Sequence, residues 1–303
     1  MNALSPVYRA QCFGLLWQSD IKLVHFADAL PSMEAVNVVV CETRSLAQRN
    51  PINRINRGFV YADGFRFAWD DIVTFDVFGG NRIEYCVGPK WTGSLPWPFF
   101  STVVALLLAW RGGLPFHGSA VSIEGKGVLI CGESGAGKSS LTAALIAEGA
   151  SFVSDDLSMA VPDPDNADWN LVIGRPGIRL FPTVGRWFFG DYTLVLPDDP
   201  RNKVIAFPAI KSEDEGCVPL NHIISLGGPT KPLTAIDQFF HLRKNLFRPN
   251  WLSQLPTFSA IKVAVRDISA STRIGVEPAI GETDEQILRG RARAIIDMVR
   301  STD

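Results

Sequence analysis

The chain has 303 residues, 47% of them hydrophobic and 20% charged, which suits one large globular domain or two modest ones. Its formal net charge of −2 excludes the large positive field on which nucleic-acid binding depends. Residues 1–14 lack a basic stretch followed by an apolar core, and the most apolar run, 98–110, is shorter than the about 20 residues that span a membrane. We therefore expect a cytoplasmic protein with neither nucleic-acid nor membrane partners.

The cysteines are scattered, odd in number and without any CxxC pair. They are Cys12, Cys41, Cys86, Cys131 and Cys217. This pattern is typical of reduced, buried thiols in a cytoplasmic protein.

The region 37–88 is predicted to form a run of short, mainly antiparallel strands, because its segments are rich in β-branched and aromatic residues. The segments read VNVVVC, GFVYA, FRFAW, IVTFDVF and RIEYCV. Asp63-Gly64 and Gly79-Gly80-Asn81 supply turns between them. An apolar helix over 98–110 follows and ends at Arg111-Gly112-Gly113. We expect a β-rich N-terminal region over 1–97 and a second domain over 98–303.

The second domain is predicted to begin with a hairpin of strands at 119–123 and 128–131. A glycine-rich stretch, a helix from about Lys138 to Glu148 and a strand over 151–154 follow. Because a hairpin is antiparallel, the sheet around the glycine-rich stretch is expected to be mixed and not purely parallel.

The rest of the chain gives a weaker pattern. Strands are predicted near 171–180 and 203–207, and a helix near 235–247. A final helix is clearer, and its apolar residues are predicted to share one face: Ile287, Leu288, Ile295, Ile296 and Val299.

Residues 132–139 satisfy the pattern GxxxxGK[ST] of a nucleotide-binding loop in full. Glycines let the backbone turn its N–H groups toward phosphate oxygens, and the helix that follows adds its positive end. Lys138 would reach the β- and γ-phosphates of ATP, and the Ser139 hydroxyl would bind Mg²⁺. The predicted nucleotide-binding residues are Gly132, Glu133, Ser134, Gly135, Ala136, Gly137, Lys138, Ser139 and Ser140; the Glu133 side chain occupies a free position of the motif.

Two carboxylates, Asp155 and Asp156, follow the predicted helix and strand directly. A GTPase would carry NKxD, but residues 202–205 lack the aspartate, and residues 225–229 are no LSGGQ-type signature of an ABC ATPase. One carboxylate could hold a metal ion while the other accepts a proton from an acceptor hydroxyl, which favours phosphoryl transfer over mechanical ATPase work. The alternative is a helix cap or turn with two solvated acids.

The segment 117–156 resembles the bacterial HPr kinase/phosphorylase family and, more closely, its shorter HPr-kinase-like relatives. The resembling residues are His117-Gly118, the hairpin, G-x-S-G-x-G-K-S, a helix ending in glycine and a strand ending in Asp155-Asp156. His117 lies 21 residues before Lys138 and Asp156 lies 18 after it, spacings similar to those of the family's active-site residues. The resemblance implies an α/β fold of the HPr kinase/PEP carboxykinase type, with a P-loop in a largely antiparallel mixed sheet.

The same resemblance implies roles for individual residues. Asp156 would accept the proton of the substrate hydroxyl, and Lys138 would neutralise developing phosphate charge. Ser139 and Asp155 would hold Mg²⁺. His117 would lie beside the phosphates; its alternative is a histidine whose ring is satisfied by backbone contacts at a strand start.

The sequence departs from the family pattern after the two acids. The full enzymes carry a metal-binding glutamate in an E-I-R-G-type motif, whereas residues 175–180 read RPGIRL and contain no acid. This departure weakens the case for a reverse, phosphorylase reaction and for HPr itself as the acceptor.

Positive side chains near the phosphates could stabilise the transferring group. The candidates are Arg175, Arg179, Arg201 and Lys203, of which Arg179 and Lys203 lie on or beside apolar runs that would fix their positions. The alternative for each is a solvated surface charge, and Arg243-Lys244 is expected to be such a face.

The function expected from these patterns is an ATP- and Mg²⁺-dependent kinase for a serine-type hydroxyl on a protein or peptide. The shorter relatives resemble kinases of peptide-modification systems, including lasso-peptide pathways. A kinase for a small metabolite and a non-catalytic nucleotide-sensing regulator are the alternatives, and homo-oligomer formation stays open.

Overall fold

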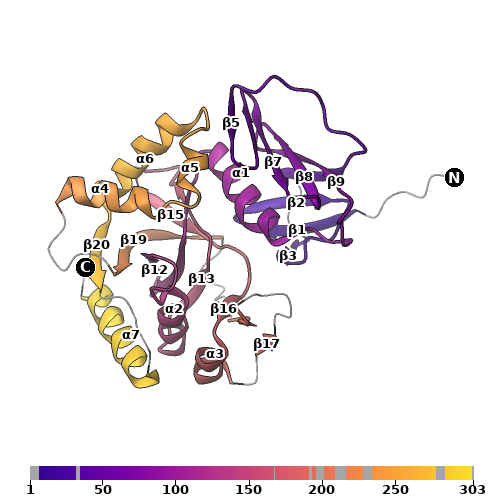
Figure 1. The fold of residues 1–303 in the computed structure, drawn as a ribbon. Coiled ribbons are helices and arrows are strands. Elements are labelled where there is room, and N and C mark those ends of the chain that lie inside the picture. Colours follow the sequence, from indigo (N-terminus) through magenta and orange to yellow (C-terminus); the bar gives the residue numbers. More distant parts are fainter. Residues whose placement is uncertain are drawn as a thin grey trace. The chain divides into compact units, whose positions relative to one another are not determined.

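The computed structural model describes residues 7–31, 35–166, 168–190, 193–195, 201–208, 216–227, 234–277 and 284–301. Contacts divide the chain into one unit of Met1–Gly113 with Phe247–Lys262 and a second of Leu114–Leu246 with Val263–Asp303. The apolar helix after residue 97 is grouped with the first unit; the domain boundary at 97 stays a prediction. Each unit is described by itself, and Figure 1 shows their elements.

A mixed sheet forms the main part of the first unit as described. Its nine strands lie in the order β3-β1-β2-β4-β9-β8-β7-β6-β5 among the residues described. They are β1 (Tyr8–Cys12), β2 (Leu15–Ser19), β3 (Ala27–Asp28), β4 (Val38–Glu42), β5 (Asn53–Ile55), β6 (Gly58–Tyr61), β7 (Gly64–Trp69), β8 (Val73–Phe78) and β9 (Arg82–Val87). Neighbours are antiparallel except β2 with β4 and β4 with β9. The strands predicted from segments rich in β-branched and aromatic residues are confirmed as β4 and β6–β9.

An apolar helical segment packs against this sheet. A π-helical turn, η1 (Phe99–Val103), runs into α1 (Val104–Trp110), and their residues up to Ala109 are buried. The rings of Phe75 on β8 and Phe99 lie 5.3 Å apart. The buried helix predicted over 98–110 is therefore confirmed. The short helix α5 (Pro249–Leu252) adds Trp251, whose ring lies 6.1 Å from that of Phe65.

A buried ion cluster lies beside the same sheet. The Asp76 carboxylate on β8 is fully buried and pairs with the guanidinium groups of Arg49 and Arg66. The guanidinium of Arg49 also lies 3.9 Å from the centre of the Tyr61 ring. A buried carboxylate is tolerated only when it is paired and hydrogen-bonded, so this cluster holds the loop of Arg49 against the sheet.

The second unit is built on a sheet of eight strands within the described residues. The strands are β10 (Leu114–Phe116), β11 (Gly118–Ile123), β12 (Lys126–Gly132), β13 (Ser151–Ser154), β14 (Ser158–Pro162), β15 (Trp169–Val172), β19 (Cys217–Leu226) and β20 (Arg273–Glu277). Their order is β10-β14-β15-β19-β12-β11-β13, with β20 also paired to β19. Only β12 with β19 and β19 with β20 are parallel in this described sheet. The predicted hairpin is confirmed as β11 and β12, and the fold is mixed α/β.

Two helices cover one face of this sheet. Figure 1 shows α2 (Lys138–Ala147) and α7 (Glu285–Arg300) side by side below β12. Leu141 and Leu145 of α2 share a core with Leu288 and Ile295 of α7. Ile287 was predicted on this face and is instead 55% exposed, because it lies about 100° around the helix from Leu288.

A small three-stranded sheet within the described residues packs beside α2. It consists of β16 (Ile178–Leu180), β18 (Val204–Ala206) and β17 (Thr193–Val195), with α3 (Pro182–Phe189) against it. Ala143 of α2 and Val184 of α3 belong to the same apolar cluster. The remaining helices are α4 (Ala235–Lys244) and α6 (Phe258–Ser271).

The expectation that the cysteines are buried is only partly correct. Cys12 and Cys131 are buried, Cys41 and Cys86 are half-buried, and Cys217 is exposed at the start of β19. In the part of the chain that the structure describes, no helix combines the length and apolar character needed to cross a bilayer.

We expect Asp76→Ala to lower the free energy of unfolding of the first unit by about 3–5 kcal/mol, because it leaves two partly buried guanidinium groups without their shared carboxylate. Denaturant unfolding followed by tryptophan fluorescence measures the change. The matched control is Asp70→Asn, which breaks the exposed pair of Asp70 with Arg57, keeps a residue that tolerates the φ of 46° there, and should cost at most about 1 kcal/mol. Equal losses in the two variants would contradict a special role for the buried cluster.

Candidate active site

The glycine-rich loop connects the end of β12 at Gly132 to the start of α2 at Lys138. Gly135 and Gly137 adopt φ values of 88° and 93°, in the left-handed region that favours glycine. A Cβ on Gly132 would lie 2.8 Å from the backbone oxygen of Leu226 on β19, so the parallel pairing of β12 and β19 leaves no space for a side chain. The loop geometry thus requires the glycines that the motif supplies.

The Lys138 side chain lies across this loop. Its Nζ donates hydrogen bonds to the backbone oxygens of Gly132, at 2.8 Å, and Glu133, at 3.0 Å. Burial lowers the pKa of Lys138, while the nearby carboxylates of Asp155 and Asp156 act in the opposite direction. The ammonium is therefore held at the loop and partly desolvated, which strengthens its interaction with an anion.

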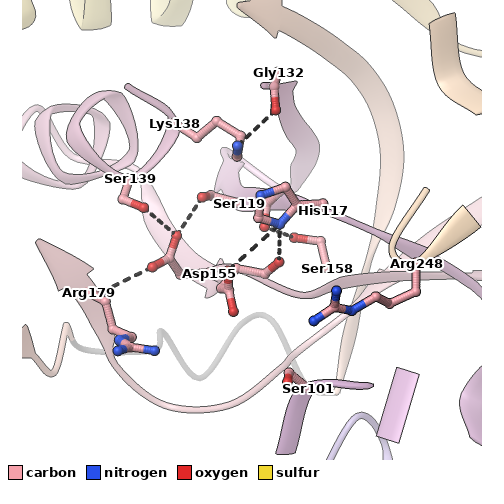
Figure 2. A network of polar contacts seen from close by, with 12 residues as sticks. Ser101, His117, Ser119, Gly132, Lys138, Ser139, Asp155, Ser158, Arg179 and Arg248 are labelled. Atoms are coloured by element: carbon pink, nitrogen blue, oxygen red, sulfur yellow. Dashed lines mark hydrogen bonds and ion pairs between the residues drawn. The ribbon is translucent and has the colours of Figure 1, made fainter. Parts of the chain in front are cut away.

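Asp155 fixes the elements around the loop. Its Oδ1 accepts hydrogen bonds from Ser139 of α2, at 2.9 Å, and from Ser119 of β11, at 2.6 Å. Its Oδ2 accepts the backbone N–H of Arg179 at 3.0 Å. The residue is only 5% exposed, and Figure 2 shows these groups converging on it. The two acids predicted from sequence therefore differ: Asp155 is a buried, bonded carboxylate and not a solvated one.

Asp156 is held in a strained turn. Its φ is +67°, and the N–H of Leu157 donates to the backbone oxygen of Asp155 at 2.8 Å, which closes a three-residue turn around Asp156. Such a turn with positive φ at its centre is rare, and a non-glycine residue in it costs about 1–3 kcal/mol. Strain of this kind concentrates at functional sites. Unlike the buried side chain of Asp155, the Asp156 side chain is 29% exposed.

His117 and Arg175 flank the Asp156 carboxylate. The Nδ1 atom of His117 lies 3.7 Å from Asp156 Oδ1 and 3.2 Å from its backbone oxygen. A guanidinium nitrogen of Arg175 lies 3.7 Å from Asp156 Oδ2, and Arg175 is buried. Burial, followed by the charge of Lys138, lowers the pKa of His117. The structure thus brings together His117 and Asp156, which were predicted as separate site residues, and adds Arg175, which the sequence had offered only as one of several cations.

Asn245 is a further site residue that the sequence pattern did not single out. Its Oδ1 accepts the N–H of Gly132 at 3.1 Å, and its backbone oxygen accepts the N–H of His117 at 2.9 Å. It follows the last residue of α4, and its Nδ2 donates to the backbone oxygen of His241 at 2.9 Å. A single residue therefore joins the start of the glycine-rich loop to the histidine.

Positive side chains line the opposite wall. Arg179, Arg201 and Lys203 border the same pocket as the loop, and Lys203 Nζ donates to the backbone oxygen of Arg179 at 3.2 Å. Burial lowers the pKa of Lys203, and the charges of Arg201 and Arg179 act in the same direction. Both cations favoured by the sequence, Arg179 and Lys203, thus lie at the pocket.

The pocket has a volume of about 170 Å³. Six of the predicted nucleotide-binding residues line it: Ser134, Gly135, Gly137, Lys138, Ser139 and Ser140. His117, Asp155 and Asp156 line the same pocket. Ala136 instead packs into the core between the sheet and its helices. The exposed Glu133 side chain pairs with Lys244 at 2.6 Å, and both side chains stay largely exposed, as expected for a solvated face at Lys244.

Ser139 and Asp155 provide hard oxygen atoms 2.9 Å apart, which suits Mg²⁺. Among the described residues, no group of three or more His, Cys, Asp or Glu side chains could hold a metal ion. Mg²⁺ is commonly bound by one or two protein ligands together with substrate phosphates and water, so the pair fits a nucleotide-dependent metal site.

One comparison with known proteins, a family model, matches the segment that contains this site. The family model described as HPr Serine kinase C-terminal domain matches residues 113–167, which contain the hairpin, the loop, α2 and both acids. The resemblance stated for residues 117–156 is thereby confirmed. The structure of the Hpr(Ser) kinase/phosphatase from Coxiella burnetii is 23% identical, with 40% of this chain and 71% of that chain covered and a TM-score of 0.26. A search of curated proteins finds no match.

We expect the imidazole of His117 to titrate below its ordinary pKa of 6.5, as followed by NMR. Asp156→Asn should lower this pKa further, because it removes a charge that favours the imidazolium, and Lys138→Met should raise it. Since the unfolded chain binds this proton at a higher pH than the folded one, His117 makes stability rise with pH through the window below 6.5. His117→Gln assigns the resonance and removes this contribution; an unmoved midpoint in Asp156→Asn would contradict the pairing.

Proposed function

We propose that this chain, which resembles the HPr serine kinase C-terminal domain over residues 113–167, is an ATP-dependent kinase for a serine-type hydroxyl of a protein or peptide. The observation that carries the proposal is the shared pocket of Lys138, Ser139 and Asp156. A loop suited to phosphate and a carboxylate suited to a proton face the same space, which is the requirement for phosphoryl transfer to an alcohol.

In the proposed reaction the acceptor hydroxyl oxygen attacks the γ-phosphorus of ATP and its proton passes to the Asp156 carboxylate. The bond between the γ-phosphorus and the oxygen that bridges to the β-phosphate breaks, and ADP leaves with the electron pair. Lys138 neutralises charge on the phosphates. His117 and Arg175, each 3.7 Å from an Asp156 oxygen, hold the carboxylate toward the acceptor.

Ser139 and Asp155 would hold Mg²⁺ together with the nucleotide phosphates. When bound, Mg²⁺ neutralises charge on the β- and γ-phosphates. The protein's own contribution is to fix both oxygens: Ser119 and the backbone of Arg179 hold the Asp155 carboxylate in place.

The positions of the cations Arg179 and Lys203 favour a function in phosphoryl transfer over one in nucleotide binding alone. Spread negative charge develops on the transferring group, and a placed cation accounts for about 10³–10⁵ in rate in comparable enzymes. Lys203 is anchored to the backbone of Arg179, so its charge is fixed in advance of the reaction. We place the protein in the cytoplasm, where ATP and a peptide acceptor, such as a lasso-type precursor, would meet it.

Asp156→Asn should abolish transfer while nucleotide binding survives. Loss of the proton acceptor should lower kcat by at least about 100-fold. Asparagine tolerates positive φ well, so the strained turn should persist. Transfer from γ-labelled ATP to candidate serine peptides, read by mass spectrometry, measures the effect, and Asp165→Asn in an exposed loop is the control. Near wild-type transfer by Asp156→Asn would refute the assignment of the general base.

The same assay separates the rival functions. A kinase for a small metabolite would leave peptides unmodified and phosphorylate a small alcohol with the same dependence on Asp156. A nucleotide-sensing regulator would bind ATP without turnover, and its biological role would be insensitive to Asp156→Asn.

Ser139→Ala should weaken ATP binding in Mg²⁺ by about tenfold, and the effect should vanish when EDTA removes the metal. Ser119→Ala is a matched control, because Ser119 donates to the same Asp155 oxygen but does not line the pocket. Calorimetric titration with a non-hydrolysable ATP analogue measures both variants. Equal Mg²⁺-dependent losses would show that the bond to Asp155, and not the metal, explains the effect of Ser139.

A further inference from the structure

Phe181 lines the same pocket as the glycine-rich loop and is nevertheless 52% exposed. The Lys203 ammonium lies over the Phe181 ring, 5.3 Å from the ring centre. Leu180 and Val184, both buried, add apolar surface to this end of the pocket. The pocket therefore combines the polar groups of the loop with an exposed aromatic ring at Phe181.

The sequence breaks a local rule at this residue. Phe181 is the N-cap of α3, with extended backbone angles, and its side chain makes no capping hydrogen bond. Ser, Thr, Asp and Asn are strongly preferred at this position because their oxygens accept free N–H groups of the first helical turn. An exposed aromatic ring where a capping residue would stabilise the helix indicates that the ring has another task.

The order of Arg175, Arg179 and Phe181 along the chain indicates which part of a nucleotide would contact the Phe181 ring. Arg175 contacts Asp156, the backbone of Arg179 contacts Asp155, and Phe181 lies two residues further on. Strand geometry places Phe181 about 7 Å beyond Arg179. The acceptor side of the pocket lies at Asp156 and the phosphate centre at Asp155, so Phe181 lies on the side away from the acceptor.

We propose that Phe181 is the platform of a nucleobase subsite, on whose ring the purine of the bound nucleotide stacks while Lys203 lies between base and phosphates. The inference rests on the proposed function, because it assumes a nucleotide held by its phosphates at the loop. Stacking on an aromatic ring accepts any base with a π-face, which leaves specificity for adenine to other groups.

The test compares a ligand that has a base with one that lacks it. Calorimetry with Mg²⁺ measures the binding of a non-hydrolysable ATP analogue and of inorganic tripolyphosphate to the wild type and to Phe181→Ser. We expect the analogue to bind about tenfold more weakly to the variant and tripolyphosphate to bind equally well. Because serine is a good N-cap, the melting temperature should not fall, which separates loss of stacking from loss of fold.

Two variants serve as controls. Phe181→Tyr keeps an aromatic ring and should bind the analogue like the wild type. Phe207→Ser removes another exposed phenylalanine, just after β18, that does not line the pocket, and it should leave both affinities unchanged.

Several outcomes would overturn the inference. Equal weakening of both ligands in Phe181→Ser would make the residue part of the phosphate site. An unchanged analogue affinity with a raised KM for the acceptor would assign the ring to the acceptor instead. If the wild type binds tripolyphosphate but not the analogue, the base subsite fails alone; if it binds neither ligand, the proposed function fails with it.

Discussion

The buried carboxylate of Asp155 is the contact on which the arrangement of the site depends. It joins β11 through Ser119, α2 through Ser139 and β16 through the backbone of Arg179. A carboxylate this deeply buried must be hydrogen-bonded, so these elements cannot separate without exposing it or leaving it unsatisfied. The next residue, Asp156, then has a defined starting point, and the strained turn carries its side chain into the pocket. Asp155 thus fixes the backbone from which the Asp156 side chain extends.

The described lining of the pocket has an excess of positive charge, which suits a polyanion. Among the described lining residues, the basic side chains outnumber the two carboxylates: Lys138, Arg179, Arg201 and Lys203 against Asp155 and Asp156. The ammonium groups of Lys138 and Lys203 are partly buried, and this burial lowers the pKa of both. Fixed, partly dehydrated cations interact strongly with phosphate and need little reorganisation when it binds. A polyanion bound in this pocket would offset the repulsion among these like charges.

Local features of the site could be predicted from the sequence, and features made by distant residues could not. The loop glycines, Lys138 and the two acids lie within one hairpin–helix–strand segment, where spacing fixes their relation. The strands β6–β9 could be predicted because their segments are rich in β-branched and aromatic residues and are separated by glycine-containing turns. The central strand β19 (Cys217–Leu226) was not predicted because Pro219 and Asn221 interrupt its apolar pattern. It forms because its pairing with β12 and β20 outweighs this weak strand propensity. The roles of Arg175 and Asn245 depend on contacts across the fold, which no local pattern records.

Asn245 shows how such a distant residue can couple the two halves of the proposed chemistry. It lies 113 residues after Gly132, yet it accepts the hydrogen bond of that glycine with its side chain and the hydrogen bond of His117 with its backbone. The histidine in turn contacts Asp156, so Asn245 links the glycine-rich loop to the residue proposed as the proton acceptor. Distances between loop and acid must be kept within about 0.5 Å for efficient transfer. The hydrogen bonds of Asn245 to Gly132 and to His117 therefore restrain the start of the loop and the histidine relative to one residue.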